Sequence, residues 1–299
     1  MKNKKAYHSI YTLFAAGALL AAGCSNDGMD DFYAAHPDAV KFGVTIGNTP
    51  ATRANTDGDG TTFLAGDRIG ISADDGTSYT TYELPAEGAE WNPADGARYL
   101  KWKQQTQSFK AYYPVTEGSS YSRFRVSAAQ NTLERLRLAD YMLAEATDKA
   151  AGAAVPLTFK HQLAKVTVIL TPAGDEADGE TFSQLEVCVY GQTIENGIVT
   201  DINTLAMGIA PYKKDENTYI AIAPPQEVKH NYTFIRIYVD SSDKIYELSG
   251  IGIPKLDKGK AYTLNLQMGH DGVKLSGITV EDWADTVEME EGEAVYDEP

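Results

Sequence analysis

The sequence predicts an all-β protein made of two tandem β-sandwich domains. Short apolar runs with a period of two recur along the chain, and Gly, Asp and Ser turn signals such as GHDG at 269–272 separate them. This pattern is typical of antiparallel sandwiches, whereas a parallel sheet would need helices between its strands. A chain of 299 residues exceeds the usual size of one domain, so we expect two.

Residues 1–23 carry the parts of a bacterial export signal. A basic start, MKNKK, precedes an apolar stretch that is too short to span a bilayer. The stretch ends in AAGC, which looks like the lipobox of bacterial lipoproteins, although Leu20 stands one place early. We therefore predict that Cys24 is acylated and becomes the first residue, and that residues 24–38 form a hydrophilic tether. The alternative is an ordinary secreted protein with a free thiol at the cleavage point.

The first predicted strand follows this tether and has one apolar face. The side chains of that face are Val40, Phe42, Val44 and Ile46. Similar alternation predicts strands at 166–170, 185–190, 235–239 and 262–266. Cys188 lies in one of them, where we expect a packed side chain without a disulfide partner.

One stretch, 128–154, invites a helix, and Asn131 or Thr132 could cap it. Its leucines do not keep one helical face, so we predict a short helix or loop followed by a strand around Tyr141–Ala144. The Ala, Gly and Asp residues at 146–154 are typical of a linker. The resulting divisions are an N-terminal domain at 39–153, a C-terminal domain at 154–283 and an acidic tail at 284–299.

The net charge of −16 argues against functions that depend on clustered cations. Binding of nucleic acid or of anionic lipid relies on Lys and Arg side chains that release counterions. We therefore expect no nucleic-acid partner, and contact with a membrane only through the lipid anchor.

Catalytic and metal-binding motifs are weak in this sequence. NTDGDG at 55–60 is like the start of an EF-hand loop, but Gly66 stands where a bidentate glutamate is needed. Ser241 and Lys244 match S-x-x-K within a predicted hairpin turn. His161 has no second ligand at zinc spacing, so we expect it to be packed or hydrogen-bonded. We predict no enzymatic activity, no cofactor and no bound metal.

Several motifs follow one another between residues 38 and 283. They include FLAGDRIGI at 63–71, PLTFKHQLAKVTVIL at 156–170, YIAIAPPQ at 219–226 and GITVEDW at 277–283. Their order and spacing resemble those of the fimbrillin-like (FimA/Mfa-like) lipoproteins of Bacteroides and Porphyromonas. The resemblance implies two transthyretin-like β-sandwiches, exported as an acylated precursor to the outer membrane. It also implies that a protease specific for Arg or Lys cuts the loop after the first strand, which a segment of another subunit then replaces.

The loop after the first strand fits that scheme. NTPATRANTDGDG contains a single basic residue, Arg53, and its Pro and Gly residues oppose regular structure. The resemblance thus implies cleavage between Arg53 and Ala54 and exchange of the first strand by β-augmentation. A plain surface loop with an incidental arginine is the alternative.

The predicted function is a fimbrial subunit acting in cell adhesion, lipid-anchored at the outer membrane, with other fimbrillin subunits as partners and a host protein or glycan as receptor. The tail ADTVEMEEGEAVYDEP sets few apolar residues among acids that would be costly to desolvate. This favours a tip, anchor or accessory component over a repeating stalk subunit.

The rival hypothesis is a monomeric surface lipoprotein that binds glycan or host protein without polymerising. It would use exposed aromatic side chains, which are dense in the first domain. They are Tyr79, Tyr82, Trp91, Tyr99, Trp102, Tyr112 and Tyr113. We expect core and cross-strand packing for most of them.

Overall fold

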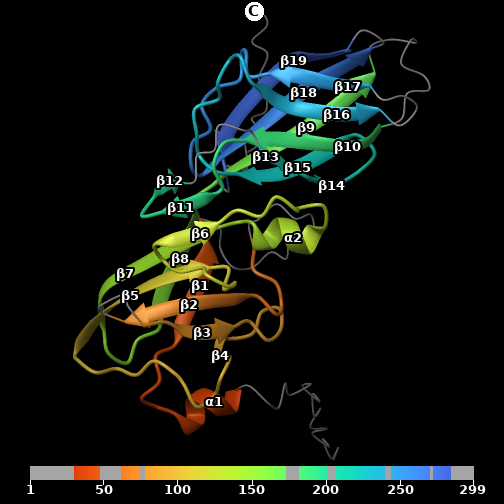
Figure 1. The fold of residues 1–299 in the computed structure, drawn as a ribbon. Helices are drawn as coiled ribbons and strands as arrows, with labels where there is room; N and C mark the ends of the chain where they lie inside the picture. Colours follow the sequence, from red (N-terminus) through yellow and green to blue (C-terminus); the bar gives the residue numbers. More distant parts are fainter. Residues whose placement is uncertain are drawn as a thin grey trace, which may run out of the picture.

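The computed structural model describes residues 30–47, 62–73, 78–172, 182–200, 207–239, 244–269 and 272–283. Within these ranges the chain forms two short helices and a succession of strands, which confirms the all-β class (Figure 1). The elements of the first half are α1 (Asp30–Ala35), β1 (Phe42–Ile46), β2 (Arg68–Ala73), β3 (Thr80–Glu83), β4 (Asn92–Pro93), β5 (Thr106–Tyr113), β6 (Arg123–Arg125), α2 (Leu133–Leu138), β7 (Met142–Ala150) and β8 (Val155–His161). Those of the second half are β9 (Ala164–Pro172), β10 (Phe182–Val189), β11 (Thr193–Glu195), β12 (Ile198–Thr200), β13 (Met207–Ile209), β14 (Tyr212–Lys213), β15 (Thr218–Ala223), β16 (Thr233–Val239), β17 (Ile245–Ser249), β18 (Lys260–Gly269) and β19 (Gly272–Asp282).

The first half is a single sheet that curls on itself. Its seven strands follow the order β1-β8-β7-β5-β2-β3-β4. β7 and β8 pair only through Met142 and Leu143, so the sheet opens there. Phe42 of β1 contacts Tyr82 of β3, with ring centroids 5.2 Å apart. Because β1 and β3 lie near opposite ends of the strand order, this contact closes the sheet around a shared aromatic core.

The second half is a sandwich of two sheets with an aliphatic core. A four-stranded sheet, β13-β10-β16-β17, packs on a five-stranded sheet, β14-β15-β9-β18-β19. Val187 of β10 and Val168 of β9 belong to the same buried cluster, as expected for strands with one inward face. The chain crosses from one sheet to the other at Ala210 and Pro211, between β13 and β14.

A small sheet joins the two halves. β6 of the first half pairs with β11, giving the order β12-β11-β6. Phe124 of β6 stacks on Tyr141 with ring centroids 4.8 Å apart, and both rings share a buried cluster with Leu136 of α2 and the core of the second sandwich. The two halves are therefore joined by continuous packing as well as by the chain.

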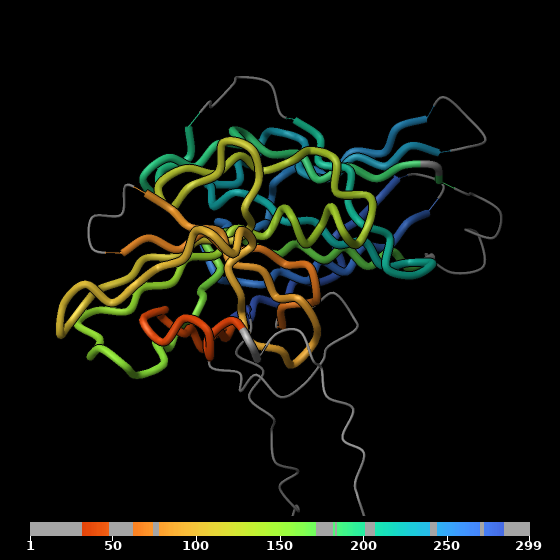
Figure 2. The backbone as a smooth tube through the Cα atoms, turned by 90° about the horizontal axis from the view of Figure 1, so that it is seen from below, coloured from red at the N-terminus to blue at the C-terminus, as the bar shows by residue number. Residues whose placement is uncertain are grey.

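Both helices in the described residues are short, and α2 has the kind of N-cap that its sequence predicted. The Oγ1 of Thr132 accepts a hydrogen bond from the backbone N–H of Arg135 at 3.2 Å, so the predicted N-cap, the short helix and the following strand are confirmed. α1 lies at the end of the first half that is remote from the second, in front of the sheet when seen from below (Figures 1 and 2). No helix among the described residues is long and apolar enough to cross a membrane.

The structure corrects the predicted linker at 146–154. β7 continues to Ala150, and Gly152, with a φ of +86°, takes part in the turn to β8. β8 pairs with β1 and β7, so the chain changes sheets between His161 and Ala164, after the predicted boundary at 153/154. Small and polar residues mark linkers and hairpin turns alike, and only the pairing of β8 distinguishes the two here.

Candidate functional site

The first predicted strand lies at an edge of the first sheet. β1 runs parallel to β8, with Phe42 opposite Val155 and Ile46 opposite Phe159. In the strand order β1 has β8 on one side and no described strand on the other. A strand at such an edge can leave or be replaced without interrupting the rest of the ladder.

Burial of apolar side chains holds this segment in place. Val40, Phe42 and Ile46 are 0%, 6% and 3% exposed, whereas Val44 is only partly buried. Phe42 also contacts Phe109 of β5, with ring centroids 5.3 Å apart. At about 1.5 to 3 kcal/mol for each fully buried side chain, these residues contribute several kcal/mol before the entropy of ordering is subtracted. The apolar face predicted from the alternation is thus present, with Val44 as its weakest member.

The held segment begins before β1. Residues 38–40 pair with residues 100–102: Val40 N–H donates to the carbonyl of Leu100 at 2.9 Å, and Trp102 N–H donates to that of Asp38 at 3.2 Å. Lys101 Nζ lies 2.9 Å from Asp38 Oδ2, and this hydrogen bond lowers the pKa of the Asp38 carboxyl. Both side chains are about half exposed, so the ion pair adds little stability beside the backbone pairing.

α1 anchors the segment at its other end, which corrects the prediction of a tether through residue 38. Tyr33 is 6% exposed, and its hydroxyl donates a hydrogen bond to the carbonyl of Trp91 at 2.6 Å. Burial raises the pKa of this phenol well above its ordinary value. Phe32 stacks on His36, and both contact the ring of Tyr99. The signal for this docking was present in the sequence as the aromatic pair Phe32 and Tyr33 within an otherwise polar stretch.

We call residues 30–47 the N-terminal segment. It ends at Gly47, whose N–H donates to the carbonyl of Phe159 at 2.8 Å. The predicted cleavage position, Arg53 and Ala54, lies outside the described residues, as does Cys24. The chain is described again from Thr62, and Phe63 packs edge-on against Trp91, Tyr113 and Phe159.

Both ends of the stretch that contains Arg53 meet at one small cavity. Ile46 and Phe63 line it together with Arg137 of α2 and Trp283 behind β19. Its volume of about 20 Å³ is too small for an organic ligand. The two described ends of the candidate cleavage loop are therefore brought together by packing.

A polar cluster lies beside this cavity. Arg137 Nη2 is 2.6 Å from Asp67 Oδ2, and the Tyr113 hydroxyl donates to Asp67 Oδ1 at 3.1 Å. Burial outweighs these partners and raises the pKa of Asp67. His161 Nδ1 is 2.9 Å from Asp140 Oδ1, and its ring stacks on Trp283 with centroids 3.7 Å apart. The prediction that His161 is packed or hydrogen-bonded is confirmed, and the structure shows both.

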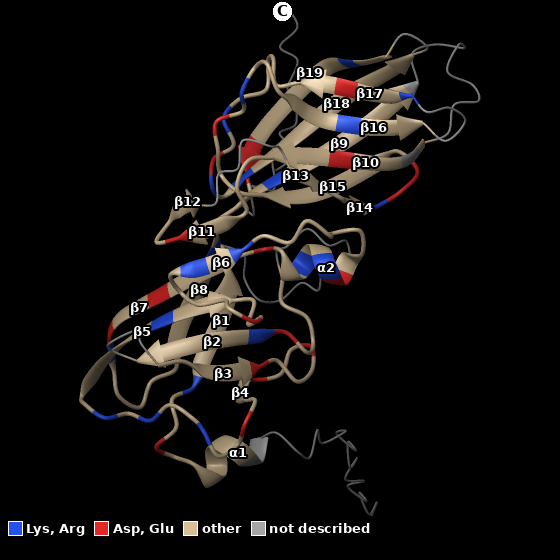
Figure 3. Cartoon of the chain, in the orientation of Figure 1, with Lys and Arg blue, Asp and Glu red and all other residues tan. Residues whose placement is uncertain are grey.

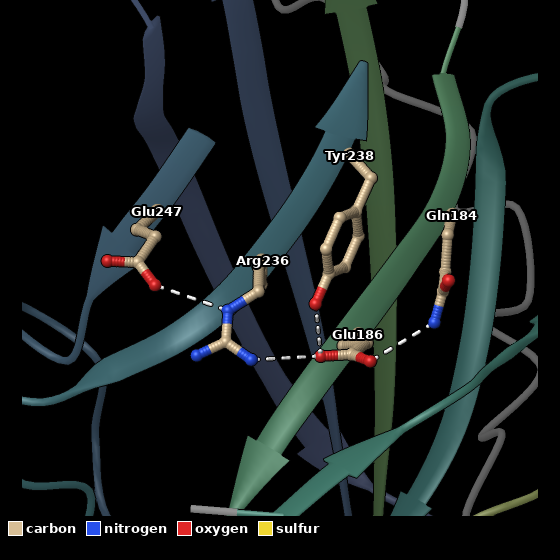
Figure 4. A network of polar contacts seen from close by, with 5 residues as sticks. All are labelled: Gln184, Glu186, Arg236, Tyr238 and Glu247. Atoms are coloured by element: carbon tan, nitrogen blue, oxygen red, sulfur yellow. Dashed lines mark hydrogen bonds and ion pairs between the residues drawn. The ribbon is translucent and has the colours of Figure 1, made fainter. Parts of the chain in front are cut away.

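The outer face of the four-stranded sheet carries a second polar network (Figure 4). Arg236 bridges Glu186 at 3.1 Å and Glu247 at 3.2 Å, and the hydroxyl of Tyr238 donates to Glu186. A Cβ on Gly208 would lie 2.5 Å from the carboxyl carbon of Glu186, so glycine leaves the room that this carboxylate needs. The network links the neighbouring strands β10, β16 and β17, and its charged groups are paired with one another.

The other residues considered for chemistry have structural surroundings. Cys188 is a free, buried thiol, as predicted, and burial raises its pKa to about 11, which disfavours the nucleophilic thiolate. Ser241 lies outside the described residues, and Lys244 stands at the start of an antiparallel return to β16. Among the described residues, no three His, Cys, Asp or Glu side chains are placed to hold a metal ion.

Most of the aromatic side chains considered for glycan binding are in the core. Tyr82, Trp91, Tyr112 and Tyr113 are buried. Tyr79, Tyr99 and Trp102 are partly buried, and each contacts another aromatic ring. This arrangement supports the packing interpretation over a stacking surface for sugars.

Comparisons with known proteins point in one direction. The family model for fimbrillin-like proteins matches residues 52–283. A solved structure from Bacteroides uniformis, of a protein proposed to act in cell adhesion, is 19% identical with a TM-score of 0.62, and the match covers 83% of this chain and 99% of that one. A similarly described protein from Bacteroides ovatus is 18% identical with a TM-score of 0.59, covering 82% and 97%. No curated protein sequence matches this chain.

Proposed function

Because the chain belongs to the fimbrillin-like family, we propose that it is a subunit of a surface fimbrium whose N-terminal segment is exchanged for a segment of another subunit. Fimbrillin-like proteins are fimbrial or cell-adhesion proteins, and this sets the class of the function. The observation that carries the finer proposal is the position of β1: a buried apolar strand at a sheet edge, followed at once by the stretch that contains Arg53.

Cleavage between Arg53 and Ala54 would break the covalent link between the N-terminal segment and the rest of the chain, but it would not itself disrupt the segment's contacts. The side chains of Val40, Phe42 and Ile46 would stay buried, and the pairing with β8 and with residues 100–102 would remain. The cut removes only the covalent link, so a free strand at sufficient concentration could then compete for the site. Trimming therefore permits exchange, while the incoming strand drives it.

The incoming segment must replace two kinds of contact. It needs apolar side chains at the spacing of Val40, Phe42 and Ile46, and main-chain groups that pair with β8. If α1 leaves together with β1, the carbonyl of Trp91 loses its hydrogen bond from Tyr33. We expect the donor to reach past β1 toward the α1 position, since uncovered aromatic surface would otherwise remain.

The composition of the tail supports a proposal for the position in the fimbrium. Residues 284–299 contain seven Asp and Glu residues and no Lys or Arg. A donor strand with this composition is poorly matched to the apolar surface that Val40, Phe42 and Ile46 cover. We therefore propose a tip, anchor or accessory subunit, with other fimbrillin subunits as partners and a host protein or glycan as receptor. Acylated Cys24 would hold the uncut precursor at the outer membrane, because cleavage after Arg53 separates Cys24 from the rest of the chain.

The test uses the full-length precursor and an arginine-specific protease. Mass spectrometry should find one early cut after Arg53, and the nicked protein should take up a labelled peptide of residues 38–47, whereas the intact precursor should not. Arg53→Ala should abolish both the cut and the uptake. A peptide with Phe42→Asp is the matched control and should not bind.

A cut without uptake would contradict strand exchange. It would leave the rival function, a monomeric surface lipoprotein that binds glycan or host protein. An excess of unlabelled peptide 38–47 should displace the bound labelled peptide. Label that is not displaced would indicate nonspecific binding instead of strand exchange.

A further inference from the structure

β19 is the longest strand at an edge of the described sheets. The strands that form the other sheet edges, β1, β4, β6, β12, β13, β14 and β17, have at most five residues, whereas β19 has eleven. The outer N–H and C=O groups of an edge strand can pair with a strand of another chain, and proteins commonly limit this by keeping such strands short. The edge of β19 is therefore the one best suited to such pairing.

Charge on β19 is confined to its two ends (Figure 3). Lys274 stands near the start, Glu281 and Asp282 stand at the end, and residues 275–280 are uncharged. Asp282 is paired with Lys260 of β18, whereas Lys274 and Glu281 are exposed and make no ion pair with any described residue. A lysine or proline near the middle of an edge strand discourages pairing with other chains, and β19 has neither there.

The register with β18 divides the side chains of β19 into two faces. The core-facing set, opposite buried residues of β18, is Val273, Leu275, Ile278 and Val280, and the outer set is Lys274, Gly277, Thr279 and Glu281. A β-bulge leaves Ser276 outside the pairing, and its hydroxyl donates to the carbonyl of Asn265 at 2.9 Å. In a regular strand Lys274 and Glu281 would face opposite sides, so the bulge brings the two charges onto one face.

We propose that two copies of the chain associate through β19, with the two strands antiparallel and Ile278 opposite Ile278 on a two-fold axis. Counted outward from that axis, with Ser276 left unpaired, Lys274 of each copy lies opposite Glu281 of the other. Leu275 then lies opposite Val280. Each position meets one from the same face of the sheet, as antiparallel pairing requires.

This register is selected by charge. Opposite charges directly across two strands attract, and the two-fold axis gives the dimer two such pairs. Moving the axis by one residue, to Gly277 or to Thr279, would place Lys274 opposite Thr279 or Trp283 and leave all four charges unpaired. The chosen register also covers apolar surface, because Val280 is 45% exposed in the single chain.

A contact of this kind ends at two subunits, because each copy uses its β19 edge in making it. It would join subunits side by side, whereas strand exchange at β1 is head-to-tail and can continue from one subunit to the next. The inference does not rest on the proposed function, since it would hold if Arg53 were never cut.

Sedimentation equilibrium of the full-length chain tests the proposal through a charge swap. The parent should pass from monomer to dimer as its concentration rises from about 1 μM to about 1 mM. Lys274→Glu alone and Glu281→Lys alone should each weaken the dimer at least about tenfold, because two like-charge pairs replace two opposite ones. An equal mixture of these two variants should dimerise like the parent, since each glutamate then faces a lysine. Lys213→Glu, exposed on β14 at the other edge of the same sheet, is the matched control and should change nothing.

Hydrogen exchange locates the contact: amides of residues 274–281 should exchange more slowly as the parent is concentrated, and not in either single variant. A parent that stays monomeric would overturn the proposal, and so would a dimer that both single variants form equally well or that their mixture does not recover. Slow exchange in β19 at every concentration would also overturn it, because the edge would then be covered within one chain. Far-ultraviolet circular dichroism of each variant checks that the fold is retained.

Discussion

β1 and β19 both end their sheets, yet they are held by opposite means. β1 has five residues, pairs in parallel with a strand more than a hundred residues away, and buries Phe42 and Ile46. β19 has eleven residues, pairs with β18 across the short connection at 270–271, and is mostly exposed or half-buried, with Val280 45% exposed. β1 thus depends on side-chain burial, and β19 on a local hairpin.

The difference indicates which edge suits exchange. A strand that belongs to a local hairpin re-forms as soon as it opens, because its partner is adjacent in the chain. A strand with a distant partner has no adjacent strand with which to re-form a hairpin. A cut beside it also removes the covalent link that keeps it near its site. What remains is burial, and another apolar strand can supply that equally well.

The largest expected effect is on burial under β1. Phe42→Ala should lower the free energy of unfolding by about 3–5 kcal/mol, since it empties a site between Tyr82 and Phe109. Val280→Ala in β19 is the matched control and should stay within about 0.5 kcal/mol. Urea unfolding followed by circular dichroism measures both. Similar losses for the two variants would break the comparison.

The second largest effect is expected from alkaline pH, which should lower the free energy of unfolding through Tyr82, the residue that packs against Phe42 of β1. Burial raises the pKa of Tyr82 from 10.0 to about 12. Below pH 10 this phenol is neutral in the folded and unfolded chain, so its contribution is complete. Between pH 10 and 12 only the unfolded chain ionises, and roughly 2–3 kcal/mol should be lost. Unfolding curves at a series of pH values should show a shallower decline in Tyr82→Phe, and an unchanged slope would refute this assignment.

The docking of α1 should contribute less. Tyr33→Phe keeps the ring and leaves the buried carbonyl of Trp91 without its donor, which should cost about 1 kcal/mol. Tyr99→Phe is a suitable control because its hydroxyl makes a long, exposed contact of 3.4 Å to Asp38 and donates to no buried carbonyl in the structure described. Hydrogen exchange at residues 90–92 locates the effect; faster exchange in β19 instead would contradict it.

The smallest effect is expected at the surface ion pair of the same segment. Lys101→Ala removes the bridge to Asp38, but both side chains are about half exposed and screened by solvent. The unfolding midpoint should not move measurably at physiological salt. A shift comparable to that of Tyr33→Phe would mean that charge, in addition to burial, fastens the segment.

Much of the fold could be predicted because its signals are local. Alternation in 40–46, 166–170 and 235–239 predicted strands that are present, and the cap was predicted to be Asn131 or Thr132, of which the structure uses Thr132. The candidate strand was found in the same way. The docking of Tyr33 was missed because the aromatic pair Phe32 and Tyr33 stands alone in a polar stretch, without the repeated apolar spacing that would predict a packed helix.

The sequence alone determined which residues form strands, which face of each is apolar and where the chain turns, since these follow from the order of neighbouring side chains. Tertiary structure decided that β8 joins the first sheet, that β1 takes the edge beside it and that β13 leaves part of β10 uncovered. Apolar strands of similar length can pair with one another at similar cost. The choice among them is therefore made by packing between distant parts of the chain, which no short stretch of sequence records.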